Sequence, residues 1–266
     1  MGKFFERYSE IVKEKNSLIN INLDPALPKQ RKDNAIPEKF VTKDDVESLL
    51  NFSFYVIEEV ADYCCSVKPN TQFFFTDSTI LRKLARKIHE NGMIAILDHK
   101  LSDIGSTNDS AIFWISDMGF DAFTFSPFAG NVQKTVVTAH NKNLGVIVLT
   151  LMSNPEAEKI MVNSVVDNQP FYKFIANEVK KSGADGCVVG LTGFVKPEYV
   201  KAVQEIVGDE VIFLLQGIGP QGGSPENIKY VSSPLVSLGR EVIFDENPKE
   251  VAKRYRELFN SMRVKK

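Results

Sequence analysis

AILDHKLSDIGST, residues 95–107, begins as an apolar run and ends as a dense cluster of charges. The apolar part, residues 93–97, is typical of a buried strand. Asp98 and Lys100 are two positions apart, so on a strand their side chains point to the same face. Asp103 follows three positions later, past the expected end of the strand. Opposite charges at the end of a buried strand must pair or take part in chemistry, so a solvated loop and a catalytic site are both open interpretations of this stretch.

The length and the 43% of hydrophobic residues provide ample material for a core and fit one large domain or two small ones. No composition break and no linker candidate divides the chain, so we expect a single domain over residues 1–266. A net charge of −2 gives no electrostatic footprint for nucleic acid. No apolar run approaches the roughly 20 residues that cross a bilayer, and the N-terminus has no signal-peptide core. Cys64, Cys65 and Cys187 form neither a disulfide framework nor a zinc ligand set. We therefore expect a cytoplasmic protein without nucleic-acid or membrane partners.

Buried-strand runs and helical periodicities alternate along the chain after a leading helix at residues 4–15. The expected strands are 18–23, 64–68, 93–97, 121–125, 145–149, 186–189, 211–215 and 234–238. The expected helices are 44–60, 77–89, 107–118, 132–140, 169–181, 197–207, a short one from 224 or 225, and 247–262. Eight repeats of this kind predict a closed (β/α)8 TIM barrel with an extra N-terminal helix.

An open doubly wound sheet is the alternative architecture. The barrel is favoured because unusual residues follow the carboxyl ends of many strands, and in a barrel these ends meet in one ring. Those residues are Asp24, Lys68, Asp98, Lys100, Ser153, the glycine loop after strand seven, and Arg240.

A phosphate site is predicted at the last two strands. The glycines of residues 217–223 follow strand seven, and Gly239-Arg240 follows strand eight. Barrels often bind phosphate at this pair of loops, where glycines let backbone N–H groups approach an anion. Arg240 could fork onto two phosphate oxygens. A flexible turn beside a surface arginine is the alternative interpretation.

The second cluster alternates two lysines with two aspartates: Lys68, Asp98, Lys100 and Asp103, with Asp24 nearby. The carboxylates keep the lysines protonated, so such a lysine is a proton donor rather than a Schiff-base nucleophile. The histidines suggest no catalytic base. His99 should face the outer helices, and His89 and His140 are most simply surface residues of helices. The sequence shows no metal-ligating trio of histidines and carboxylates, so we expect no metal.

Residues 98–107, DHKLSDIGST, resemble the DxKxxDIxxT signature of the orotidine 5′-phosphate decarboxylase family. The likeness extends along nearly the whole chain, through motifs at six strands in order. Besides the signature, these are NLDP at 22–25, VKPN at 67–70, DAFT at 121–124, LTLMSN at 149–154, GIGPQGG at 217–223 and Gly239-Arg240.

The resemblance implies decarboxylation of orotidine 5′-phosphate to uridine 5′-phosphate, the last step of de novo UMP synthesis, without a cofactor. Lys100 would stabilise the carbanion at C6 and then protonate it. Asp98 would lie against the leaving carboxylate, and Lys68 and Asp24 would hold the ribose hydroxyls.

The resemblance also implies the remaining site residues. The substrate-binding set includes Asn70, with Ser153 at the pyrimidine and Gln221, Gly239 and Arg240 at the phosphate. In a homodimer, the partner subunit's site would receive Asp103, Ile104 and Thr107. One departure from the family is Gln216-Gly217, where the family commonly has Pro-Gly at the start of the loop that closes over phosphate.

Two alternatives remain for the function. Sugar-phosphate lyases of the same barrel group also carry Asp-x-Lys-x-x-Asp, but they use magnesium and place a glutamate at the strand-two position. Here that position is Lys68, whose charge would repel the metal. A non-catalytic phosphate-binding barrel would require a broken set of charges, and the set is intact.

Overall fold

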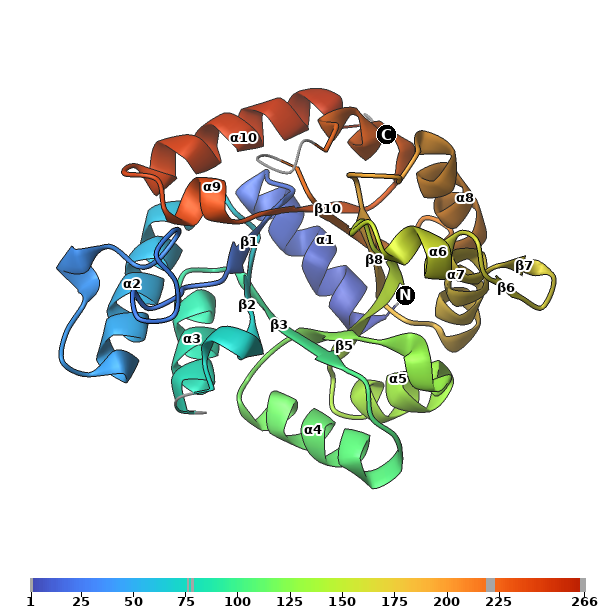
Figure 1. The fold of residues 1–266 in the computed structure, drawn as a ribbon, viewed down its shortest axis with the longest axis horizontal. Helices are drawn as coiled ribbons and strands as arrows, with labels where there is room; N and C mark the ends of the chain where they lie inside the picture. Colours follow the sequence, from blue (N-terminus) through green and yellow to red (C-terminus); the bar gives the residue numbers. More distant parts are fainter. Residues whose placement is uncertain (1, 76, 78, 219–222, 264–266) are drawn as a thin grey trace.

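The computed structural model describes residues 2–75, 77, 79–218 and 223–263. Eight parallel strands close into a barrel in the order β1-β10-β9-β8-β5-β4-β3-β2, with helices around it (Figure 1). The predicted (β/α)8 barrel is confirmed. The barrel strands are β1 (Ile19–Leu23), β2 (Ser66–Pro69), β3 (Ile94–Leu101), β4 (Ala122–Phe125), β5 (Gly145–Leu151), β8 (Gly186–Gly190), β9 (Ile212–Gln216) and β10 (Pro234–Leu238).

The α-helices connect the strands and pack their apolar faces on the barrel. They are α1 (Lys3–Lys15), α2 (Asp45–Val60), α3 (Thr79–Glu90), α4 (Gly105–Asp117), α5 (Val132–His140), α6 (Ala157–Met161), α7 (Phe171–Ser182), α8 (Pro197–Val207), α9 (Arg240–Ile243) and α10 (Pro248–Met262). Short 3₁₀ turns are η1 (Glu38–Phe40), η2 (Thr71–Phe73), η3 (Pro127–Ala129) and η4 (Pro225–Tyr230). No helix in this part of the chain is both long and apolar enough to cross a membrane.

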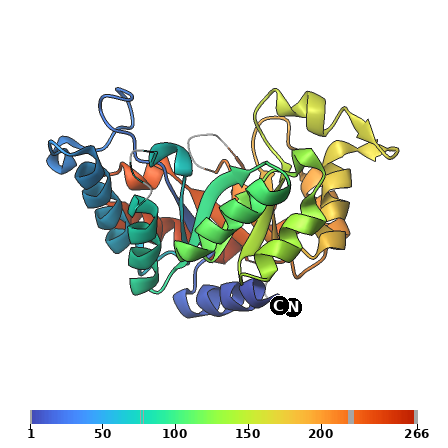
Figure 2. The ribbon, with the colours of Figure 1, turned by 90° about the horizontal axis from the view of Figure 1, so that it is seen from below.

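Helix α1 covers the end of the barrel at which the strands begin (Figure 2). Its apolar side chains are buried, and Tyr8 Oη donates a hydrogen bond to the Pro234 carbonyl at 2.8 Å. Phe4 packs so closely on Gly145 that a Cβ there would lie 2.5 Å from its ring. The extra N-terminal helix therefore closes one end, and the opposite end carries the loops that follow the strands.

Three features differ from the expected elements. β3 continues past Leu97 to Leu101, with a register shift against β4 between these two residues. The loop after β5 contains α6 and a small antiparallel hairpin, β6 (Val165–Val166) and β7 (Gln169–Pro170). The helix expected from Gln169 begins at Phe171, because Gln169 and Pro170 pair in that hairpin.

The histidines lie only partly as predicted. His99 faces the outer helices α3 and α4, as expected. His89 is half-buried rather than a simple surface residue, whereas His140 is exposed as expected, and both contact a carboxylate. His89 Nε2 lies 2.8 Å from Asp121 Oδ2, and His140 Nε2 lies 2.9 Å from Asp185 Oδ2.

Candidate active site

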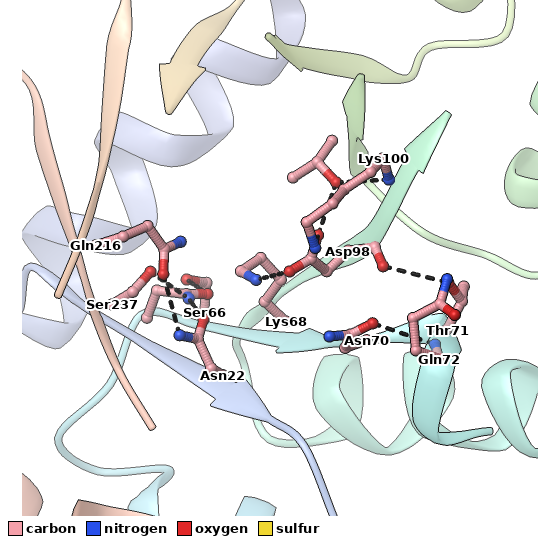
Figure 3. Close-up of polar contacts among 12 residues, drawn as sticks. Asn22, Ser66, Lys68, Asn70, Thr71, Gln72, Asp98, Lys100, Gln216 and Ser237 are labelled. Carbon is pink, nitrogen blue, oxygen red and sulfur yellow. Dashed lines mark hydrogen bonds and ion pairs between the residues drawn. The ribbon is translucent and has the colours of Figure 1, made fainter. Parts of the chain in front are cut away.

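A cavity of about 560 Å³ opens at the carboxyl ends of the strands, where the sequence places its unusual residues. Its lining includes charged and amide side chains from β1, β2, β3 and β9 (Figure 3). Residues that follow β5 and β8 complete it. The predicted site residues in this lining are Asp24, Lys68, Asn70, Asp98, Lys100 and Ser153.

Lys68, Asp98 and Lys100 form one ion-paired group. The Lys68 ammonium contacts Asp98 Oδ2, and Lys100 Nζ lies 2.7 Å from Asp98 Oδ1. Burial opposes ionisation of Asp98, but the two ammonium groups outweigh it and hold the pKa of Asp98 well below its usual range. Lys68 is 3% exposed at its side chain and Lys100 is 42% exposed. The site therefore holds a fixed carboxylate between a buried cation and one that reaches the cavity.

Thr124, on β4, holds this group in place. Its Oγ1 accepts a hydrogen bond from the Lys100 backbone N–H at 2.9 Å and lies 2.9 Å from Asp98 Oδ1, to which it donates. Lys100 has a φ of 51°, in the left-handed region that non-glycine residues seldom adopt. This kink coincides with the register shift of β3. Sequence reasoning quoted Thr124 only as part of a motif and missed this positioning contact.

Asp24 follows β1 and shares the cavity with the ion-paired group. Burial raises the pKa of Asp24, and the Asp98 carboxylate raises it further, while Lys68 and the Asn70 amide partly oppose them. Its Oδ1 is buried and has no hydrogen-bond partner among the described residues. A buried acceptor without a partner is costly, so this oxygen is suited to a hydroxyl or another donor from a ligand.

Asp103, Ile104 and Thr107 do not join the other site residues within one chain. All three are exposed, with Ile104 62% exposed. Asp103 Oδ1 accepts a hydrogen bond from the Ile104 N–H at 2.8 Å, and its carbonyl accepts one from Asn131 Nδ2 at 2.9 Å. Three members of the predicted charge cluster thus meet, and the fourth lies outside the cavity at the start of α4.

A second cavity of about 330 Å³ lies beside the first at the last two strands. Gly217, Gly239 and Arg240, which were predicted to bind phosphate, contribute to its lining. Gly217 has a φ of 95°, which favours glycine. Gln221 lies outside the described residues, as do Gly219 and Gly222 of the same loop.

The two cavities share a wall made of Asn22, Asp24 and Gln216. Asn22 Nδ2 donates to Gln216 Oε1 at 3.2 Å (Figure 3). Sequence reasoning did not assign Asn22 to the site. Its signal was the alternation of Asn20 and Asn22 with apolar residues along the strand, because alternate positions of a barrel strand point inward.

Ser153 follows β5 and packs against the end of β8. A Cβ at Gly190 would lie 2.4 Å from Ser153 Cβ, so only glycine leaves room for this residue in its present position. The loop that carries Ser153 thus depends on a glycine from a strand that is adjacent in the barrel.

A closed barrel with charged side chains at the carboxyl ends of its strands defines an enzyme of the (β/α)8 class. Among the described residues, no three histidine, cysteine, aspartate or glutamate side chains gather in the way that metal ligands do. The chemistry that these side chains provide is electrostatic: a preorganised ammonium beside a carboxylate, next to a cavity lined by arginine and glycine.

The chain belongs to the orotidine 5′-phosphate decarboxylase/HUMPS family, whose profile matches residues 45–255. It is 31% identical to the orotidine 5′-phosphate decarboxylase of Thermomicrobium roseum, over 98% of this chain and 96% of that one. The solved structure of Leishmania donovani OMP decarboxylase has the same fold, with a TM-score of 0.81, 22% identity and full coverage of both chains. Leishmania donovani UMP synthase also matches, with a TM-score of 0.81, 24% identity and 98% of this chain covered, and the chain spans 57% of its length.

Proposed function

We propose that this enzyme decarboxylates orotidine 5′-phosphate to uridine 5′-phosphate, the last step of de novo UMP synthesis. The observation that carries the proposal is the group formed by Lys68, Asp98 and Lys100 in the main cavity. Family membership and the decarboxylase names of the relatives support it. A second cavity lined by Arg240 suits the phosphate of the same substrate.

In this mechanism the substrate carboxylate lies beside the ionised Asp98. The bond between C6 and the carboxylate carbon breaks, carbon dioxide leaves, and the electron pair stays on C6. The Lys100 ammonium stabilises this carbanion and then transfers a proton from Nζ to C6. Because the ammonium is fixed before the reaction, it needs little reorganisation as charge develops, and no cofactor takes part.

The other residues bind the rest of the nucleotide. Asp24 and Lys68 hold the ribose hydroxyls, and the unpartnered Asp24 oxygen suits this role. Ser153 hydrogen-bonds the pyrimidine, and Asn70 lines the same cavity. Phosphate is held by Arg240, Gly239 and Gln221, and contacts to this distant group contribute by shaping the site for the transition state.

We further propose a homodimer in which Asp103 completes the charge cluster of the neighbouring site. Ile104 and Thr107 contribute to the same neighbouring site. Their exposure at the start of α4, and the separation of Asp103 from the other three charged residues, support this arrangement. The three buried cysteines are free, which is consistent with a cytoplasmic protein.

The decisive experiment is incubation of the purified protein with orotidine 5′-phosphate, following the loss of its ultraviolet absorbance with and without EDTA. We expect turnover that EDTA does not change. Magnesium-dependent turnover of a sugar phosphate instead would favour the lyase alternative. An absence of turnover under every condition would contradict the decarboxylase proposal.

A further inference from the structure

The loop between β1 and α2, residues 25–42, does more than connect two elements. It rises at the end of the barrel that carries the site, opposite α1 (Figure 2). It brings Arg31 to the wall of the second cavity, which Arg240 also lines. This cavity therefore has two arginines that come from opposite ends of the chain.

The Arg31 guanidinium contacts groups from several parts of the chain. Its Nε donates to the Asn34 carbonyl at 2.9 Å, and Nη2 donates to the carbonyls of Asn34 and Asp24. Its planar face lies against two rings, with centroid distances of 5.6 Å to Phe73 and 5.9 Å to Phe244. A guanidinium that is already fixed loses little side-chain freedom when it binds an anion.

Part of the guanidinium remains available for a ligand. Nε and Nη2 are occupied, whereas Nη1 makes no hydrogen bond with any described residue. Nη1 carries two N–H donors in the plane of the guanidinium. These donors belong to a side chain that lines the cavity.

The balance of charges in the second cavity is a second reason to expect that Arg31 binds an anion. Two carboxylates, Asp24 and Glu241, line the cavity together with Arg31 and Arg240. Glu241 Oε1 is buried and has no hydrogen-bond partner among the described residues. With Arg240 alone, two carboxylates and one cation would face an incoming phosphate, which would leave a net repulsion. With Arg31 the four side chains balance.

We propose that Arg31 is a second phosphate-binding arginine, which donates from Nη1 to the phosphate monoester of the nucleotide substrate. The proposal rests on the proposed function for the identity of the substrate, but not for the anion site itself. Arg31 acts in binding and specificity: it lets the cavity accept a doubly charged phosphate in spite of its two carboxylates. The residue that sequence reasoning assigned to this task, Arg240, acts with it.

The test compares ligands with and without the phosphate. Calorimetry would measure binding of uridine 5′-phosphate and of uridine to the wild type and to Arg31→Met. We expect Arg31→Met to weaken binding of the nucleotide roughly ten- to a hundredfold, the usual effect of a lost charge-assisted hydrogen bond, and to leave uridine unchanged. Arg31→Lys keeps the positive charge but not the planar guanidinium with its paired donors, so its loss of nucleotide affinity should be smaller than that of Arg31→Met.

The matched control is Arg256→Met. Arg256 also stacks on a ring, 4.7 Å from the Tyr63 centroid, and donates to a backbone carbonyl, but it lies on α10 away from both cavities. It should bind both ligands as the wild type does. Unchanged nucleotide binding by Arg31→Met, or an equal loss for nucleotide and nucleoside, would overturn the proposal. If Arg31→Met does not fold, Arg31→Lys decides, because a phosphate-dependent loss is still required of it.

These outcomes are separate from those of the decarboxylase assay. If the wild type binds uridine 5′-phosphate but does not turn over orotidine 5′-phosphate, the proposed function fails and the role of Arg31 in phosphate binding is still measured. If turnover is normal and Arg31→Met binds the nucleotide normally, only the role of Arg31 fails.

Discussion

At the scale of single residues, Lys100 combines the proposed chemistry with a strained backbone. Its left-handed φ turns the chain within β3, and the N–H that this turn presents is bound by Thr124. Left-handed backbone costs a residue such as lysine about 1 kcal/mol or more. The ion pair with Asp98 and the contact with Thr124 compensate for this cost, so the charge and the strain belong to one arrangement.

Replacing Lys100 by asparagine separates these two contributions. Asparagine tolerates the left-handed conformation but has no ammonium group. We expect Lys100→Asn to reduce turnover at least about a thousandfold, because both carbanion stabilisation and the proton donor are lost. The thermal midpoint should remain near that of the wild type. Turnover close to the wild-type rate, measured on folded protein, would refute the assigned role, as it would for Lys100→Ala.

We expect the buried carboxyl of Asp24 to lower the free energy of unfolding while it contributes to activity. Because burial raises its pKa in the folded state, its contribution to stability is present at low pH and is lost as the pH rises through the folded pKa. Asp24→Asn removes this ionisation and should raise the free energy of unfolding at neutral pH by about 1 kcal/mol while lowering activity. Urea unfolding between about pH 3.5 and about pH 8 should show a gap between variant and wild type that opens as the pH rises above 3.8, the ordinary pKa of an aspartate. A difference in the free energy of unfolding that does not change with pH would contradict a raised pKa of Asp24 in the folded state.

At the scale of elements, two helices are tied to strands by the same kind of contact. His89 at the end of α3 contacts Asp121, whose Oδ2 also accepts the Ala95 N–H at 2.8 Å. His140 at the end of α5 contacts Asp185, whose Oδ2 accepts the Val146 N–H at 2.9 Å. Each aspartate therefore joins the end of a helix to the beginning of the next barrel strand.

The His140 contact should make stability depend on pH. The hydrogen bond from His140 to Asp185 raises the pKa of His140 above its ordinary value of 6.5. Its stabilisation is therefore complete below that value and is lost as the pH rises through the raised pKa. Because the His140 side chain is 39% exposed and solvent weakens its interaction with Asp185, His140→Gln should cost only about 0.5 kcal/mol at about pH 5.5 and less at about pH 8.5. Chemical denaturation at the two pH values measures this, and an equal cost at both would show that the charge is unimportant.

Much of the architecture follows from local sequence patterns. Helices 132–140 and 197–207 and strand 234–238 have the predicted bounds, because the apolar pattern within each segment marks them. The register shift of β3 depends on its pairing with β4, so it has no local signal. The hairpin at 165–170 does have a local signal that sequence reasoning missed, since Asp167 and Asn168 adopt the positive φ of a two-residue hairpin turn.

The site divides in the same way. The structure confirms the prediction that Lys68, Asp98 and Lys100 lie close together. It was possible from the sequence because the barrel fold places the carboxyl ends of neighbouring strands side by side. Arg31 reaches the second cavity only through the path of a long loop, and Asn22 and Gln216 meet although β10 lies between their strands. A pattern within one segment does not indicate which side chains from distant segments come together.

At the scale of the whole molecule, the proposed dimer divides the charge cluster between subunits. Mixed Asp103→Ala and Lys100→Ala subunits should regain activity, because a hybrid dimer has one site with both native residues. Random pairing predicts about a quarter of the wild-type activity, since half of the dimers are hybrid and each has one intact site. No recovery, despite subunit exchange shown by native mass spectrometry, would argue against a shared site.

The position of α1 has a consequence for synthesis of the chain on the ribosome. This helix is synthesised before the barrel strands, yet two of its partners come much later: Tyr8 bonds a residue 226 positions along the chain, and Lys3 one 140 positions along. At the usual rate of elongation, 226 residues take roughly 10–45 s. The Tyr8 contact therefore cannot form until β10 has been synthesised, so complete docking of α1 on the barrel comes late in folding of the nascent chain.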